Sequence, residues 1–130
     1  MSIRHLLLDT HAFLWWLDDN ERLGQHTRSL IADAENVVHV SAASILEIAI
    51  KRRLGKLQAP DQLANIVEEE GFSPLSITSH HAEISGALPI IHKDPFDRLL
   101  IAQSQAEYLE LVSVDSIFPE YQVRLVDAGQ

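Results

Sequence analysis

The 130-residue sequence contains no cysteine, so it has neither a disulfide framework nor a thiolate zinc site. It also lacks any apolar run approaching the roughly 20 residues that a membrane helix requires. The N-terminal stretch MSIRHLLLDTHAFLWW carries no signal-peptide cleavage pattern. These absences predict a cytoplasmic protein that does not associate with a membrane.

Positive charge is scarce as well. The 10 lysines and arginines are outnumbered by 19 aspartates and glutamates, which gives a net charge of -9. Proteins that hold nucleic acid over a broad face neutralise many phosphates with clustered basic residues. If this protein handles nucleic acid, the contact must therefore be local.

Short β-rich runs alternate with longer runs of helical period along the chain. Strands are expected at residues 3–8, 37–40, 72–78, 111–114 and 122–126, and helices at residues 12–19, 21–35, 41–55, 60–70, 79–89 and 94–108. Such alternation is typical of α/β proteins with a parallel sheet. Because no repeat or linker interrupts it, we expect one domain spanning residues 1–130. Pro74 within the third strand indicates a sheet edge.

Two aspartates follow predicted strands directly. Asp9 comes after IRHLLL, and Asp115 comes after LVSV. In open parallel sheets, ligands bind beyond the carboxyl ends of the strands. Each aspartate alone is also a normal turn or helix-capping residue, but together they favour a binding site.

Glu47 is the only charged residue between Ala42 and Ile50, in a predicted helix that is apolar nearly all round. A buried carboxylate is costly unless it is paired or accepts several hydrogen bonds. One explanation is a salt bridge to Lys51, one helical turn away, or a protonated acid. The other is a metal ion.

The stretch HKDPFDRLLIAQ contains two further acids, for which a structural role and a metal-binding role must again be compared. Asp94 before Pro95 predicts a helix start, since aspartate favours the N-cap and proline the first helical position. Asp97, at the third helical position, could reach back to the N-cap amide. With right-handed crossovers, this helix start lies at the same end of the sheet as Asp9 and Asp115.

Four carboxylates, those of Asp9, Glu47, Asp97 and Asp115, could thus meet in one crevice. Their oxygen ligands would select Mg²⁺ or Mn²⁺ rather than zinc, and such sites commonly carry out phosphoryl transfer. The seven histidines form no HExxH pattern. Zinc hydrolysis is therefore disfavoured.

The sequence resembles the PIN domain family, and within it the VapC-like toxins of bacterial toxin-antitoxin pairs. The resemblance is carried by LLLDTHAFLWWL, VSAASILEIAIKRRLGKL, LPIIHKDPFDRLLIAQSQ and LVSVDSIFPEYQVRLV, which together span nearly the whole chain. The family's acidic site falls on Asp9, Glu47, Asp97 and Asp115. Two positions depart from the usual pattern, because Leu46 replaces a common tryptophan and Ser113 a common threonine. Ser113 keeps a hydroxyl that can bond to a neighbouring ligand.

The resemblance implies a three-layer α/β/α domain with a central, mostly parallel sheet of about five strands. It implies a ribonuclease in which a metal-activated water attacks an RNA phosphodiester, leaving a 5′-phosphate and a 3′-hydroxyl. The implied partners are the RNA substrate, a cognate antitoxin and a second copy of the chain. Thr10 would orient Asp9 or a metal-bound water. The basic residues nearest the site are candidates to hold RNA phosphates, although they could equally be solvated: Lys51, Arg52, Arg53, Lys56, Lys93 and Arg98.

Two alternatives remain open at this stage. An acidic crevice at strand ends also describes a Mg²⁺-binding receiver domain. That fold requires an acidic pair after the first strand and a lysine after the fifth, and neither is present. The second alternative is a PIN-like binding module without catalysis, which the presence of all four acids disfavours.

Overall fold

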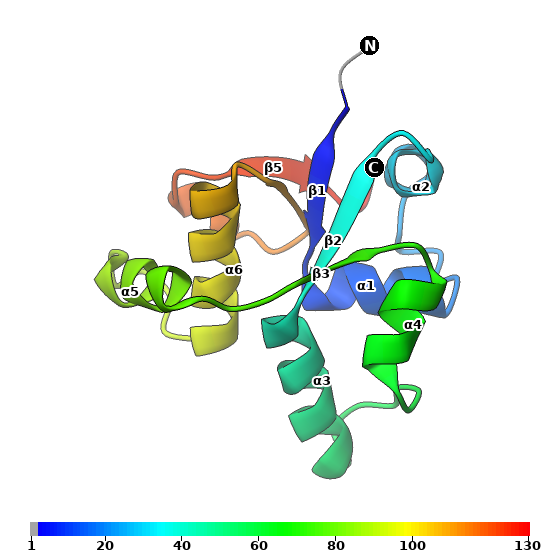
Figure 1. Ribbon diagram of the computed structural model, residues 1–130, viewed down its shortest axis with the longest axis horizontal. Coiled ribbons are helices and arrows are strands. Elements are labelled where there is room, and N and C mark those ends of the chain that lie inside the picture. The colour runs from blue at the N-terminus through cyan, green and yellow to red at the C-terminus, as the bar shows by residue number, and fades with distance from the viewer. Residues whose placement is uncertain (1–2) are drawn as a thin grey trace.

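The protein, described over residues 3–130 in a computed structural model, is built around a sheet of five parallel strands (Figure 1). The strands are β1 (His5–Leu8), β2 (Val37–Ser41), β3 (Ser73–Leu75), β4 (Glu110–Ser113) and β5 (Arg124–Asp127), in the order β3-β2-β1-β4-β5. Every pairing is parallel. The prediction of an α/β fold with a five-stranded sheet is therefore confirmed.

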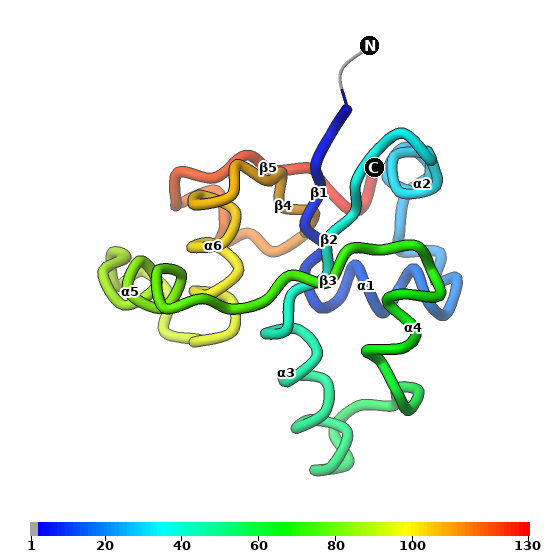
Figure 2. The backbone as a smooth tube through the Cα atoms, in the orientation of Figure 1, coloured from blue at the N-terminus to red at the C-terminus, as the bar shows by residue number. Residues whose placement is uncertain are grey.

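Helices flank this sheet on both sides. They are α1 (Thr10–Leu17), α2 (Gln25–Ala32), α3 (Ala42–Arg53), α4 (Leu63–Glu69), α5 (Ser79–Ala87) and α6 (Pro95–Glu107), with a short 3₁₀ helix at Phe118–Glu120. In Figure 1, α5 and α6 lie to one side of the sheet and α1, α2 and α4 to the other. Figure 2 shows the chain crossing between these sides through β3. Among residues 3–130, no helix has the length and apolar character needed to span a membrane.

The two faces of the sheet carry separate apolar cores, as the two-residue period of a strand requires. Leu6 and Leu8 of β1 pack with Phe13 on the face covered by α1. Leu7, between them, packs with Leu100 of α6 in the other core. All three leucines of β1 are fully buried. Burial on both faces explains why this strand is continuously apolar.

Several boundaries differ from the sequence prediction. β5 begins two residues later than expected, and α4 begins at Leu63 instead of Pro60. The positive φ of Gln62 (58°) places the helix start after this residue.

β3 does lie at a sheet edge, where Pro74 removes no hydrogen bond from the sheet interior. The strand order also differs from the 2-1-3-4-5 order of receiver domains.

Two helices begin directly where strands end. β1 passes through Asp9 into α1, and Ser41 at the end of β2 caps α3. The Ser41 hydroxyl accepts the N–H of Ala43 at 3.0 Å, as its predicted N-cap role requires. α3 ends before Gly55, whose φ of +73° favours glycine. These abrupt strand-to-helix junctions bring side chains of α1 and α3 to the carboxyl end of the sheet.

Candidate active site

Asp9 occupies the junction between β1 and α1 and is almost completely buried. Its Oδ1 accepts the N–H of Ala12 at 2.8 Å, so it is also the N-cap of α1. Burial raises the pKa of Asp9 to about 6, although bonds from the Ser113 hydroxyl and Ala12 N–H oppose this shift. The negative charge of Asp97 raises the pKa further. A buried carboxylate in this position is stabilised by a nearby cation.

This pKa predicts how stability depends on pH in the absence of metal. The folded-state pKa of Asp9 lies above its unfolded value of about 3.9, so folding binds a proton between pH 4 and 6. In EDTA, ionisation of Asp9 should therefore lower the free energy of unfolding by about 3 kcal/mol as the pH rises through that window. Urea denaturation of the wild type and Asp9→Asn should show the variant gaining relative stability from pH 4 to 6. A constant difference across that range would contradict the raised pKa.

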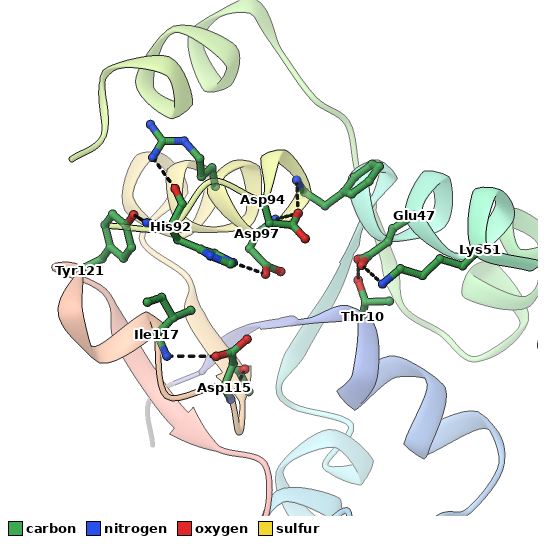
Figure 3. A network of polar contacts seen from close by, with 12 residues as sticks. Thr10, Glu47, Lys51, His92, Asp94, Asp97, Asp115, Ile117 and Tyr121 are labelled. Atoms are coloured by element: carbon green, nitrogen blue, oxygen red, sulfur yellow. Dashed lines mark hydrogen bonds and ion pairs between the residues drawn. The ribbon is translucent and has the colours of Figure 1, made fainter. Parts of the chain in front are cut away.

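Glu47 lies in α3 with only 5% of its surface exposed. Its Oε1 accepts the hydroxyl of Thr10 at 2.6 Å, and its Oε2 pairs with Lys51 Nζ at 2.7 Å (Figure 3). The salt bridge expected as one explanation for this carboxylate is thus present. Thr10 was expected to orient Asp9 or a metal-bound water, and its hydroxyl donates to Glu47 instead of Asp9. Its role toward a metal-bound water stays a prediction. The Lys51 side chain is 43% exposed, so its ammonium can leave this contact for solvent.

Asp94 and Asp97 have different local roles at the start of α6. Asp94 is the N-cap, and its Oδ1 accepts the N–H groups of Phe96 at 2.8 Å and Asp97 at 3.3 Å. Asp97 does not close a capping box within the described hydrogen bonds. Its Oδ2 instead contacts Nε2 of His92 at 2.7 Å (Figure 3). The predicted capping role of Asp94 is confirmed. Asp97 pairs with His92 through Oδ2, so its Oδ1 is available for another partner.

Electrostatics connects Asp97 to the other acids. Burial raises the pKa of Asp97, the bond from His92 lowers it, and the charges of Asp94 and Glu47 raise it again. The pKa of Lys51 is raised chiefly by its hydrogen bond to Glu47, with further contributions from the charges of Asp94 and Asp97. Negative charge therefore accumulates where α3 and α6 meet, and Lys51 compensates part of it.

Asp115 is exposed in the loop after β4. Its N–H donates to the Ser113 hydroxyl at 3.0 Å, and its Oδ1 accepts the N–H of Ile117 at 3.0 Å. The Ser113 hydroxyl also lowers the pKa of Asp9, so this residue connects the loop to the end of β1. The hydroxyl that Ser113 retains is thus used in hydrogen bonding, as anticipated.

Figure 3 shows Glu47, Asp97 and Asp115 reaching from three different elements toward the same region. Charge interactions connect Asp9 with Asp97 and Asp97 with Glu47, but among residues 3–130 the four predicted acids do not form a compact set of ligands. Over residues 3–130, the group of potential ligand atoms that lie within 4.8 Å of one another consists of His92, Asp94 and Asp97. His92 was not identified from the sequence, because its spacing from Asp97 matches no metal-binding motif. The sequence signal that could have identified His92 was its position two residues before Asp94, the predicted N-cap.

Of the six predicted RNA contacts, Lys51 pairs with Glu47, and the other five differ in their surroundings. Arg53, Lys56 and Lys93 are exposed, while Arg52 pairs with Asp61 on the surface. Arg98 differs from the prediction, because its guanidinium donates to four backbone carbonyls between Ser85 and His92 at 2.7 to 3.0 Å. These bonds assign Arg98 to holding the α5–α6 loop instead of an RNA phosphate.

The parallel five-stranded sheet, with acids after β1 and β4 and further acids in α3 and α6, defines an α/β domain with carboxylates gathered at the carboxyl end of its sheet. The PIN domain family model matches residues 6–123, and the chain belongs to this family. Ribonuclease VapC16 of Mycobacterium tuberculosis is 44% identical over 59 residues. That match covers 42% of each chain, so the aligned part is less than half the length of this curated relative.

Solved structures share the fold over almost the full chain. DNA-bound VapBC from Salmonella typhimurium superposes with a TM-score of 0.69 at 17% identity, covering 97% of this chain and 98% of that one. VapBC2 from Rickettsia felis, bound to a promoter DNA fragment, gives 0.67 at 14% identity over 94% and 97% of the two chains. FitAcB from Neisseria gonorrhoeae gives 0.63 at 22% identity over 95% and 97%. At these identities the likeness establishes the fold.

Proposed function

We propose that this chain is a Mg²⁺- or Mn²⁺-dependent endoribonuclease and the toxin of a toxin-antitoxin pair. It would hydrolyse RNA phosphodiester bonds and leave a 5′-phosphate and a 3′-hydroxyl. The observation that carries the proposal is the proximity of Asp9, Glu47 and Asp97 at the carboxyl end of the sheet in a PIN-domain chain. The partial match to Ribonuclease VapC16 supports the choice of RNA.

The donor set fits a hard divalent cation. The side chains that would hold it are those of Asp9, Glu47, Asp97 and Asp115, all of which offer carboxylate oxygens. Burial and mutual repulsion raise the pKa values of Asp9 and Asp97, and both effects are relieved by added positive charge. When bound, the ion would neutralise charge on the phosphate and lower the pKa of the attacking water.

The protein's own side chains would prepare this site. Thr10 holds one oxygen of Glu47, and Lys51 neutralises the other until a cation arrives. Lys51 would then be free to contact a phosphate. Three exposed basic residues could bind the RNA backbone. Arg53 lies at the end of α3, Lys56 lies just after α3, and Lys93 lies just before α6. This small basic group agrees with a local contact in a chain of net charge -9.

A protein partner is supported by an apolar stripe on α3. Leu46, Ile50 and Leu54 follow one another at four-residue spacing and are 51%, 43% and 61% exposed. Exposed apolar stripes of this kind favour protein contacts. The structural relatives include VapBC complexes and a toxin-antitoxin complex from Klebsiella pneumoniae. We therefore propose an antitoxin partner and a homodimer for this chain. We also propose a cytoplasmic location, which the absence of cysteine from the sequence fits.

The direct test is cleavage of a mixed RNA substrate by purified protein. Cleavage should require Mg²⁺ or Mn²⁺, stop in EDTA, resume when metal is restored, and produce 5′-phosphate ends. Calorimetry should show Mn²⁺ binding to the metal-free protein. Metal binding without cleavage of any RNA would favour the inactive binding module, and RNA binding without metal binding would contradict the proposed site.

A further inference from the structure

His92 contacts a proposed metal ligand without belonging to the predicted site. Its Nε2 lies 2.7 Å from Asp97 Oδ2, and the two side chains are 26% and 20% exposed. Since the charged carboxylate can only accept a hydrogen bond, Nε2 must carry the proton. One oxygen of Asp97 is therefore fixed by His92, and the other is left for a different partner.

The backbone of His92 is hydrogen-bonded through both its N–H and its carbonyl, although it lies in the loop between α5 and α6. Its N–H donates to the Tyr121 hydroxyl at 2.9 Å, and that hydroxyl donates to the Pro89 carbonyl at 3.0 Å. Arg98 donates to the His92 carbonyl at 2.9 Å. Tyr121 is 6% exposed and packs in the core beside α6. The imidazole thus projects from a backbone fixed by a buried tyrosine and by Arg98.

We propose that His92 is a positioning residue for Asp97, and that Tyr121 acts on the metal site through His92. The proposal rests on the proposed metal-dependent function. A carboxylate whose second oxygen is hydrogen-bonded presents its first oxygen in one orientation, which reduces the cost of binding an ion. Partners of this kind typically contribute about 10–100-fold to metal affinity or activity.

Mn²⁺ calorimetry on the full chain tests this arrangement. His92→Ala should raise the Mn²⁺ Kd by about 10–100-fold, and Tyr121→Phe should raise it by a smaller factor. His92→Gln should recover most of the affinity, because its amide can donate to Asp97. His80→Ala and Tyr108→Phe are the matched controls, since both residues are exposed, and neither should change the Kd. Thermal melting in EDTA checks that each variant folds.

A double variant separates positioning from general support of the fold. If Tyr121 acts through His92, adding Tyr121→Phe to His92→Ala should not weaken Mn²⁺ binding further. Additive losses would overturn the role of Tyr121, and unchanged affinity in His92→Ala would overturn the role of His92. Equal losses in His92→Gln and His92→Ala would indicate direct metal ligation and reject positioning. Absence of Mn²⁺ binding by the wild type would instead refute the proposed function.

Discussion

Replacing Glu47 with glutamine is expected to lower RNA cleavage steeply while leaving the fold intact. The change removes one negative charge from the proposed metal site without altering side-chain volume. The amide oxygen of the new side chain would still accept the Thr10 hydroxyl, and Lys51 can turn to solvent because its side chain is 43% exposed. We expect cleavage to fall by about two orders of magnitude or more, the loss typical of removing one electrostatic contact to developing charge.

Cleavage rates at saturating Mg²⁺, circular dichroism and melting curves would measure this effect. Arg53→Gln is a useful control, because it changes the charge of the same helix at an exposed position away from Glu47. That variant should keep its metal affinity and lose at most part of its RNA affinity. Near-normal cleavage by Glu47→Gln would show that Glu47 serves only its salt bridge with Lys51.

The second prediction with a large expected effect concerns Asp94 and Asp97, which should respond differently to replacement by asparagine. Asp97→Asn keeps a side chain that can accept the His92 hydrogen bond but removes a charge from the site, so Mn²⁺ affinity and cleavage should fall steeply. Asp94→Asn should cost little, because asparagine caps helices about as well as aspartate. Asp94→Ala should lose about 1 kcal/mol of stability, since the N–H groups of Phe96 and Asp97 would lose their acceptor.

Both asparagine variants would be purified without metal, titrated with Mn²⁺ by calorimetry and assayed on mixed RNA at saturating Mg²⁺. Their side chains differ from the wild type by the same atom replacement, so each controls for the other. An inactive Asp94→Asn together with an active Asp97→Asn would exchange the ligand and the cap. The site would then be centred on the compact group of His92, Asp94 and Asp97.

The sequence alone determined the layout of this protein. Apolar runs buried on both faces of a parallel sheet have a strong local signal, as β1 illustrates. Asp9 directly follows β1, and Asp115 lies two residues after the end of β4, so both could be placed near the carboxyl ends of strands. The capping roles of Ser41 and Asp94 could also be predicted from the sequence, because an N-cap bonds to residues next to it in the chain. Element boundaries were predicted wrongly where turns decided them, as at Gln62 before α4.

Only the tertiary structure decided which side chains meet. Thr10 bonds to Glu47 across 37 positions, and Tyr121 reaches His92 across 29. Arg98 binds loop carbonyls instead of remaining free, and His92 pairs with Asp97 in a loop whose path depends on those bonds. Contacts between distant segments follow from how helices pack on the sheet, and residue spacing along the chain does not encode them. Sequence therefore placed the acids at one end of the sheet, and packing selected the partners that orient them.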